Sequence, residues 1–226
     1  MNPPILFAAG AIKTAVEHLL ASGAWAGPPP AIHYGTAGAL RDRVLAGEPA
    51  DVVVTSEEHL AKLRALAVLP LGAAGTGLAL RDGAPRRPIN TPEALRATLL
   101  AAESIAWADP ASGATGGRHF AKVIADLGIE AAIRAGSRLF DFGVEAVAAC
   151  GRGEVELAVS QATEIAGRPG VSLLGLFPPP YDLSTAYAAG ALRETPEARA
   201  LLALLDSEAA RAALAAIGFT PKDASR

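Results

Sequence analysis

The chain has 226 residues, of which 51% are hydrophobic and 19% are charged, so it can bury a sizeable core and is neither disordered nor fibrous. The formal net charge is −3 and no basic cluster occurs, which excludes an electrostatic basis for binding nucleic acid or an anionic membrane. No apolar run approaches the roughly 18 residues that a membrane-spanning helix needs. The single cysteine, Cys150, excludes an internal disulfide and lies in a helical pattern that predicts a buried, inert thiol.

Short β-like runs alternate with helical patterns from the start of the chain, which predicts a mostly parallel sheet covered by helices. The first strand is expected at 5–8, the second at 31–34 and a fully buried third at 51–55. Thr36 is expected to cap the helix after the second strand, and Thr55 and Glu58 have capping-box spacing. The apolar stripes expected on the first two helices are Ile12, Ala15, Val16, Leu19 and Leu20, then Leu40, Val44 and Leu45.

The middle of the chain begins with a glycine-rich segment at 72–77, followed by a candidate crossing strand at 78–80 and a solvated link at 82–88. Thr91 and Pro92 then predict a helix start. A strand at 104–108 precedes a helix that is expected to end at Gly128. The core positions expected on these two helices are Leu95, Leu99 and Leu100, then Phe120, Val123, Ile124 and Leu127.

The last third predicts a helix at 142–149, strands at 155–160 and 171–176, a segment crossing back at 183–189, and helices at 196–205 and 207–217. Thr195 is the expected cap of the first of these C-terminal helices and Gly218 the stop of the second. The order of elements predicts two α/β lobes. The first would combine 1–81 with 186–226, the second would be 82–185, and the hinge segments would lie near 77–83 and 182–188.

Residues 109–120, here called the anion-binding loop, run from a small hydroxyl-bearing turn into a helix expected to begin near Gly117. Its glycines allow close approach of the backbone to a ligand, and the helix start supplies unsatisfied N–H groups. Ser112 and Thr115 offer hydroxyl donors, and Arg118 offers a planar fork suited to a carboxylate. The plain alternative is a turn between a strand and a helix.

Small-residue turns of the same form occur at 8–11, 35–38 and 140–144. In an open α/β sheet, ligands bind outside the carboxyl ends of the strands, where helix N-termini collect. These turns and the anion-binding loop are therefore expected to face a cleft between the two lobes.

Five segments of this sequence resemble a known family. They are Ala-Gly-Ala-Ile at 9–12, the segment from Tyr34 to Leu40, Ala-Gly-Glu-Pro-Ala-Asp-Val-Val-Val at 46–54, the segment from Arg152 to Val159, and the closing pattern at 207–219. They are similar to those of type II periplasmic solute-binding proteins of the molybdate-binding-like branch. The resemblance covers nearly the whole chain.

The resemblance implies the type II fold, in which two lobes, each a mostly parallel sheet flanked by helices, close on a small anion. It implies no cofactor. No metal site is expected either, because four scattered histidines and one cysteine offer no metal-ligand cluster. The expected partners are the anionic ligand and an ABC permease of an uptake system, and we expect a monomer that neither binds nucleic acid nor spans a membrane. The expected location is periplasmic if a signal peptide has been removed, and otherwise cytoplasmic.

The site departs from the family pattern at three places. Ala11 stands where the family places a serine, Thr36-Ala37 where it has a serine pair, and Gln161 where it has a tyrosine. Lost hydroxyls together with Arg118 favour an organic carboxylate over a molybdate-type oxyanion. The expected ligand-binding residues are Gly10, Ala11, Thr36, Ala37, Thr55, Ser112, Thr115, Gly117, Arg118, Gly143, Val144, Ser160 and Gln161.

Two other functions stay open. The branch also resembles isomerases of unsaturated tricarboxylic acids (aconitate-isomerase-like), and a 1,3-proton shift needs a base, for which His119, Asp141 and Glu164 are candidates. Their plain alternatives are a surface histidine, a helix cap and a solvated loop residue. Similar folds also sense metabolites in regulators, although this chain carries no DNA-binding helix pair. Without a clear catalytic pair, binding without turnover is the first expectation.

Overall fold

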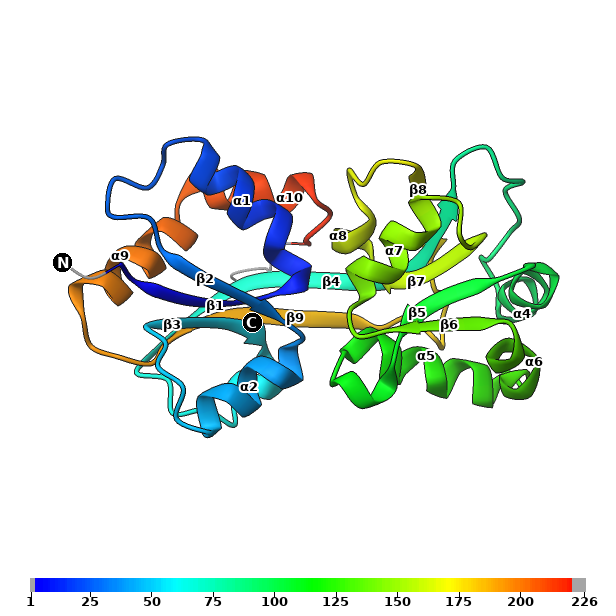
Figure 1. Ribbon diagram of the computed structural model, residues 1–226, viewed down its shortest axis with the longest axis horizontal. Coiled ribbons are helices and arrows are strands. Elements are labelled where there is room, and N and C mark those ends of the chain that lie inside the picture. The colour runs from blue at the N-terminus through cyan, green and yellow to red at the C-terminus, as the bar shows by residue number, and fades with distance from the viewer. Residues whose placement is uncertain (1–2, 221–226) are drawn as a thin grey trace. The chain divides into compact units, whose positions relative to one another are not determined.

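The computed structural model describes residues 3–220, which form two compact units (Figure 1). Unit 1 comprises 3–74 and 185–220, and unit 2 comprises 75–184. The chain leaves unit 1 along strand β4 (Ala67–Arg81) and returns at the start of strand β9 (Ser184–Ala191). The hinge role expected for 77–83 and 182–188 stays a prediction.

In unit 1 the strands follow the order β2-β1-β3-β9, with the first part of β4 next to β9, and helices flank them. Strands β1, β2 and β3 are parallel to one another, and β9 runs antiparallel to β3. Every residue of β3 is buried, as its run of valines predicted. The elements are β1 (Ile5–Ala9), η1 (Gly10–Ile12), α1 (Lys13–Ala21), β2 (Ala31–Gly35), α2 (Ala37–Leu45), β3 (Val52–Ser56), α3 (Glu57–Leu60), α9 (Pro196–Leu205) and α10 (Glu208–Ala216).

Unit 2 has a sheet in the order β4-β7-β5-β6, with β8 paired to β4. Strands β7, β5 and β6 are parallel, so their carboxyl ends meet at one edge, whereas β4 runs antiparallel to β7. The elements are α4 (Pro92–Ala101), β5 (Ile105–Ala108), η2 (Pro110–Ser112), α5 (Thr115–Asp126), α6 (Glu130–Ala135), β6 (Ser137–Phe140), α7 (Gly143–Gly151), β7 (Leu157–Gln161), α8 (Ala162–Ile165) and β8 (Val171–Leu176).

The central strands β5 and β7 of the unit 2 sheet are buried on both faces because helices cover each side. On one face Trp107 and Val159 pack against Phe120 of α5 and its neighbours. On the other face the small side chains of Ala106 and Ala158 pack against α7, where Cys150 is buried as predicted. Burial raises the pKa of the Cys150 thiol to about 11, so it is an inert core residue.

Most predicted elements and caps are confirmed, because their signals are local. The hydroxyls of the predicted caps Thr36, Thr91 and Thr195 each accept a hydrogen bond from the N–H three residues on, at the start of α2, α4 and α9. Ser207 caps α10 in the same way, although sequence reasoning did not name it. Gly128 and Gly218 adopt the left-handed conformation just after helix ends, as expected of stop residues.

The predicted Thr55 cap is wrong. Ser56 holds the N-cap position of α3, and the Thr55 hydroxyl instead donates to the carbonyl oxygen of Ala37 at 3.1 Å. The glycine-rich segment at 72–77 belongs to the fifteen-residue strand β4, which begins well before the crossing strand expected at 78–80. Gly77 lacks a side chain where the backbone of Gly175 in β8 packs against it, so the glycine serves strand packing.

Two predicted core leucines lie on the surface. Leu45 is 61% exposed at the end of α2 and Leu100 is 42% exposed near the end of α4. The sheet covers a narrower stripe of each helix than the apolar pattern suggested. Sequence reasoning also missed α6 and β6, which are only six and four residues long and therefore carry little periodic signal.

At the amino-terminal end of the unit 2 sheet, Glu156 hydrogen-bonds to the segments that contain Arg87 and Glu103. Its carboxylate accepts hydrogen bonds from the Glu103 N–H at 2.9 Å and from the Arg87 guanidinium, while its own N–H donates to Ser104 Oγ. Burial acts to raise the pKa of Glu156, but these hydrogen bonds outweigh burial and lower it. The ionised carboxylate therefore stabilises the fold.

We expect Glu156→Ala to lower the free energy of unfolding by about 1–3 kcal/mol at neutral pH, because it leaves the Glu103 N–H and Arg87 without their acceptor. A lowered pKa gives stability above the unfolded value of about 4.3 that is lost as the pH falls through the folded value. Urea unfolding at neutral and acidic pH should thus show the difference between variant and parent shrinking in acid. Glu130→Ala, which removes the exposed partner of Arg134, is the control and should change stability by about 0.5 kcal/mol or less. A pH-independent loss for Glu156→Ala would contradict the assignment.

Candidate functional site

The carboxyl ends of β5, β6 and β7 lie together in unit 2, and the residues that follow them form what we call the unit 2 edge (109–118, 140–144 and 160–164). The Asp109 N–H donates to the carbonyl oxygen of Phe140 at 2.7 Å, which joins the first two segments. Helices α5 and α7, of twelve and nine residues, both begin at this edge. Their first N–H groups and positive dipole ends favour an anion there.

The first part of the anion-binding loop forms a short, capped 3-10 helix, η2. Asp109 accepts from the Ala111 N–H at 2.8 Å and caps η2, and Gly113 adopts the left-handed conformation with a φ of 80°. Helix α5 begins at Thr115 rather than near Gly117. Ser112 and Thr115 are half-buried at the turn and the helix start.

Gly117 has a packing reason to be glycine. A side chain at this position would run into the carbonyl group of Ala108, at the end of β5. The missing Cβ therefore lets α5 lie directly against the strand. The expectation that Gly117 also contacts a ligand stays a prediction.

Arg118 lies one residue further along α5 and is exposed. Within residues 3–220 its guanidinium group has neither a hydrogen bond nor an ion pair. Long side chains of a helix point back toward its N-terminus, so Arg118 can reach over the first turn of α5. It is thus an exposed positive group beside the unit 2 edge.

A hydrogen-bonded carboxyl group, that of half-buried Glu164, lies at the start of α7. Ser160, the fourth residue of β7, is buried and its hydroxyl donates to Glu164 Oε2, and the backbone of Gln161 also hydrogen-bonds to this carboxyl group. A side chain on Gly143, the first residue of α7, would collide with both Ser160 Oγ and the Glu164 carboxyl group. Glycine at 143 is therefore what allows the carboxyl group to sit against the helix start, with Val144 next in the helix.

Burial raises the pKa of Glu164 above its usual range. The hydrogen bonds from Ser160 and Gln161 and the charge of Arg168 act in the opposite direction and offset only part of the rise. A carboxyl group of this kind can donate a hydrogen bond when neutral and is a stronger base than an ordinary carboxylate when ionised. Perturbed groups of this type cluster at functional sites.

The other two proposed bases differ from Glu164. His119 Nε2 lies 2.7 Å from the carbonyl oxygen of Tyr181, so this nitrogen carries a proton and donates it to the carbonyl. The His119 ring also lies 6.1 Å from the Phe177 ring. Asp141 is exposed, and the described part of the chain offers its side chain no hydrogen bond. Among the three candidates, Glu164 is the carboxyl group that hydrogen bonds from Ser160 and from the Gln161 backbone hold in place.

Two hydroxyl groups missed by sequence reasoning lie close to this edge. Thr163 precedes Glu164 in α8, and Thr76 of β4 is the register partner of Gln161 in β7. Both side chains are 1% exposed, and neither hydroxyl has a hydrogen-bond partner among the described residues. A buried hydroxyl without a partner costs about 1–3 kcal/mol, so such groups fit donors to a bound molecule. A threonine in a strand or short helix carries no sequence signal of this kind.

The strand ends of unit 1 form a second edge. Gly10 and buried Ala11 lie in η1 after β1, and Thr36 caps α2 by accepting from the Ala39 N–H at 3.1 Å. The Ala37 carbonyl oxygen accepts a hydrogen bond from the hydroxyl group of Thr55, whose side chain is fully buried. The idea that these residues and those of unit 2 share one ligand stays a prediction.

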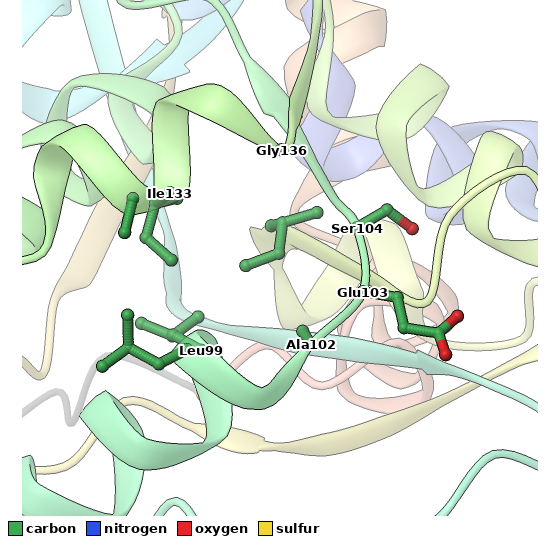
Figure 2. Close-up of a pocket in the computed structure, with 9 residues that line it drawn as sticks. Leu99, Ala102, Glu103, Ser104, Ile133 and Gly136 are labelled. Carbon is green, nitrogen blue, oxygen red and sulfur yellow. The ribbon is translucent and has the colours of Figure 1, made fainter.

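The hollow shown in Figure 2 lies at the opposite end of the unit 2 sheet. It has a volume of about 60 Å³ between α4 and α6, where Leu99 and Ile133 point into it from one side and Glu103 and Ser104 point away from them. This volume holds only a few water molecules. It is therefore no site for an organic ligand.

A wider groove of unit 2, of about 580 Å³, is lined by Arg86, Arg87 and Leu176 among others. Its two guanidinium groups are used within the unit, because Arg86 donates to the carbonyl groups of Leu173 and Leu174 and Arg87 pairs with Glu156. From residue 3 to residue 220 no group of His, Cys, Asp and Glu side chains is arranged to hold a metal ion. None of the helices in that range is long and apolar enough to cross a membrane.

Comparison with known proteins gives three kinds of match. A model of the bacterial extracellular solute-binding protein family matches residues 5–220. An aconitate isomerase from a Pseudomonas species is 32% identical over 194 residues, covering 81% of this chain and 72% of that protein.

Solved structures match at lower identity. The Azotobacter vinelandii periplasmic molybdate-binding protein aligns with a TM-score of 0.75 at 20% identity, over 97% of this chain and 99% of that one. PEB3 of Campylobacter jejuni with bound L-phospholactate aligns with a TM-score of 0.70 at 13% identity, over 97% and 100%. At identities of 20% and 13%, the similarity to these two structures shows the fold alone.

The roles of two adjacent glycines in α5 can be separated. We expect Gly117→Ala to lower the free energy of unfolding by about 1–3 kcal/mol, because the new methyl group meets the Ala108 carbonyl group. Gly116→Ala is the matched control, since nothing lies within 4 Å of the position that its Cβ would take. It should leave stability unchanged or raise it by about 0.4–1 kcal/mol. Denaturant unfolding of both variants checks this, and equal stability of the two would contradict the packing role of Gly117.

Proposed function

Because this chain belongs to the bacterial extracellular solute-binding protein family, we propose that it binds a small organic anion with several carboxylates at the unit 2 edge. The fold is the type II periplasmic-binding-protein fold, with mixed sheets flanked by helices, so the resemblance inferred from the sequence is confirmed. Membership of the family implies a small ligand. Delivery of that ligand to an ABC permease and a periplasmic location are parts of the same proposal.

The observation that carries the proposal is the meeting of the α5 and α7 N-termini at one edge, with Arg118 beside them. Two helix starts and one guanidinium group supply separate positive regions, which suit a ligand with more than one carboxylate. The buried hydroxyls of Thr76 and Thr163 add neutral donors close by. A bidentate guanidinium–carboxylate contact fits the planar group better than a tetrahedral oxyanion.

The hydroxyl groups of the site also favour an organic acid over molybdate. A dehydrated oxyanion site relies on neutral donors that surround the ion. Here the Ser160 hydroxyl at the unit 2 edge donates to Glu164, so this donor is already used. The relative at 32% identity is an aconitate isomerase, and aconitate is a tricarboxylate.

We expect Arg118→Ala to weaken binding of citrate or aconitate about tenfold to a hundredfold, since a hydrogen bond to a charged group contributes about 1.5–3 kcal/mol. Titration calorimetry against these acids, molybdate and sulfate measures this. Lys122→Ala is the matched control, because Lys122 is exposed on α5 four residues further from the helix start. Equal affinities of Arg118→Ala and the parent would remove Arg118 from the site. Tightest binding of molybdate would overturn the preference for an organic acid.

The second candidate function is isomerisation of an unsaturated tricarboxylic acid. Two observations favour it: the aconitate isomerase relative, and the enclosed Glu164 carboxyl group, which none of the binding contacts requires. The scaffold alone decides nothing here, because one fold hosts both binding and catalysis.

Incubation of the protein with trans-aconitate and with cis-aconitate should interconvert the two acids at a rate proportional to protein concentration. Proton NMR of the mixture follows each isomer through its vinyl signal. Tricarballylate, the saturated analogue, is the control and should bind without change. If neither aconitate isomer is converted at any pH between 5 and 9, the isomerase proposal fails and binding alone remains.

A further inference from the structure

We infer that Glu164 is the group that moves the proton in the isomerisation proposed above, with Ser160 as its positioning residue. This inference rests on the second candidate function and names one base among the three that the sequence offered. It is argued from contacts inside unit 2 alone.

The first step is the geometry of the carboxyl group. Ser160 Oγ and the Gln161 backbone hold it, and the absence of a side chain on Gly143 gives it room. A carboxyl group fixed from two sides keeps one orientation relative to the strand ends. A base must be positioned in this way to meet one carbon of a bound substrate.

The second step concerns the two competing candidates. Nε2 of His119 donates to the Tyr181 carbonyl group, which leaves Nδ1 as the ring nitrogen that can accept a proton, and no group of the described chain hydrogen-bonds to Nδ1. Asp141 is exposed and its carboxylate has no neighbour in the described chain that fixes it. Neither is a carboxyl group held by two hydrogen bonds, as Glu164 is.

The third step is electrostatic. Removal of an allylic proton leaves negative charge that spreads onto the adjacent carboxylates of the substrate. The positive N-terminal ends of α5 and α7 at the same edge, together with Arg118, stabilise this negative charge. Because burial raises the pKa of Glu164, its ionised form is a stronger base than an exposed carboxylate. Arg168 is the charged side chain that acts on it, and it favours the ionised form.

The reaction then balances without any oxidant or co-reactant. A carboxylate oxygen of Glu164 takes a proton from the CH₂ carbon next to the double bond, so a C–H bond breaks and an O–H bond forms. The electron pair spreads over the three allylic carbons. The same proton, or one exchanged from solvent, returns to the far carbon of the former double bond, so the O–H bond breaks and a new C–H bond forms. The double bond has moved by one position, and nothing is oxidised or reduced.

The test uses the whole protein in D₂O with trans-aconitate as the probe. Deuterium uptake into the CH₂ carbon, followed by NMR, reports proton removal even when no net isomerisation occurs. We expect Glu164→Gln to lower the exchange rate at least a hundredfold. The affinity for tricarballylate, measured by calorimetry, should stay within about threefold of the parent, because the amide keeps the shape of the acid.

Folding of this variant is expected to be preserved. The raised pKa of Glu164 means that the folded protein prefers the neutral form of this carboxyl group. The contribution of Glu164 to stability is therefore fully present below the unfolded pKa of about 4.3, and it is lost as the pH rises through the folded pKa. Glutamine is neutral at every pH, and its side-chain oxygen can still accept from Ser160. Thermal unfolding at pH 7 should therefore show a Glu164→Gln protein at least as stable as the parent.

Ser160→Ala tests the positioning role. The Ser160 hydrogen bond lowers the pKa of Glu164, so its loss should move the acid limb of the exchange-rate profile to higher pH. A merely structural role would lower the rate equally at every pH. Ser172→Ala in β8 is the control and should leave the profile unchanged. Asp141→Asn and His119→Gln should each keep at least a tenth of the parent rate.

The outcomes separate the two proposals. If the parent protein exchanges and Glu164→Gln exchanges equally fast, Glu164 is not the base, while the isomerase proposal survives. If Glu164→Gln loses exchange and tricarballylate affinity to the same extent, Glu164 holds ligand rather than moving a proton, and the inference is overturned. If the parent exchanges no proton of either aconitate isomer, the isomerase proposal fails and the inference fails with it.

Discussion

The parallel ladder of β7, β5 and β6 is the constraint on which the candidate site depends. Parallel strands end on the same side, so the segments that follow them must meet at one edge, and each segment here leads into a helix. The edge therefore gathers two helix starts without any basic cluster in the sequence. A chain with a net charge of −3 can attract an anion in this way, because the positive potential is built locally from backbone dipoles.

Glycine does different work at the two helix starts. In α5 the missing side chain of Gly117 brings the helix against the end of β5, which fixes where its first N–H groups point. In α7 the missing side chain of Gly143 makes room for the Ser160–Glu164 pair. One glycine thus places the donors, and the other admits an acid beside them.

The two candidate functions, binding and isomerisation, use the same fold and differ in whether the Glu164 carboxyl group takes part. In the proposed function, helix N-termini, Arg118 and buried hydroxyls hold a polycarboxylate, and the Glu164 carboxyl group next to them is the group proposed to move a proton. In a transport protein such a group would cost binding energy, since its ionised form repels an anion. Its presence at the edge therefore bears on the question of catalysis more directly than the family or the fold does.

The sequence by itself determined the order of most strands and helices, except α6 and β6, together with the caps at Thr36, Thr91 and Thr195 and the loops that follow the strands. These signals are local, since caps, stops and periodic stripes depend on residues within one or two turns of each other. It named Glu164 and Ser160 but could not join them, and it attributed Gly117 to ligand approach. Only the tertiary structure decided those pairings and the exposure of Leu45 and Leu100, because they depend on which segment packs against which. Packing between distant segments is set by the whole core, which no local pattern encodes.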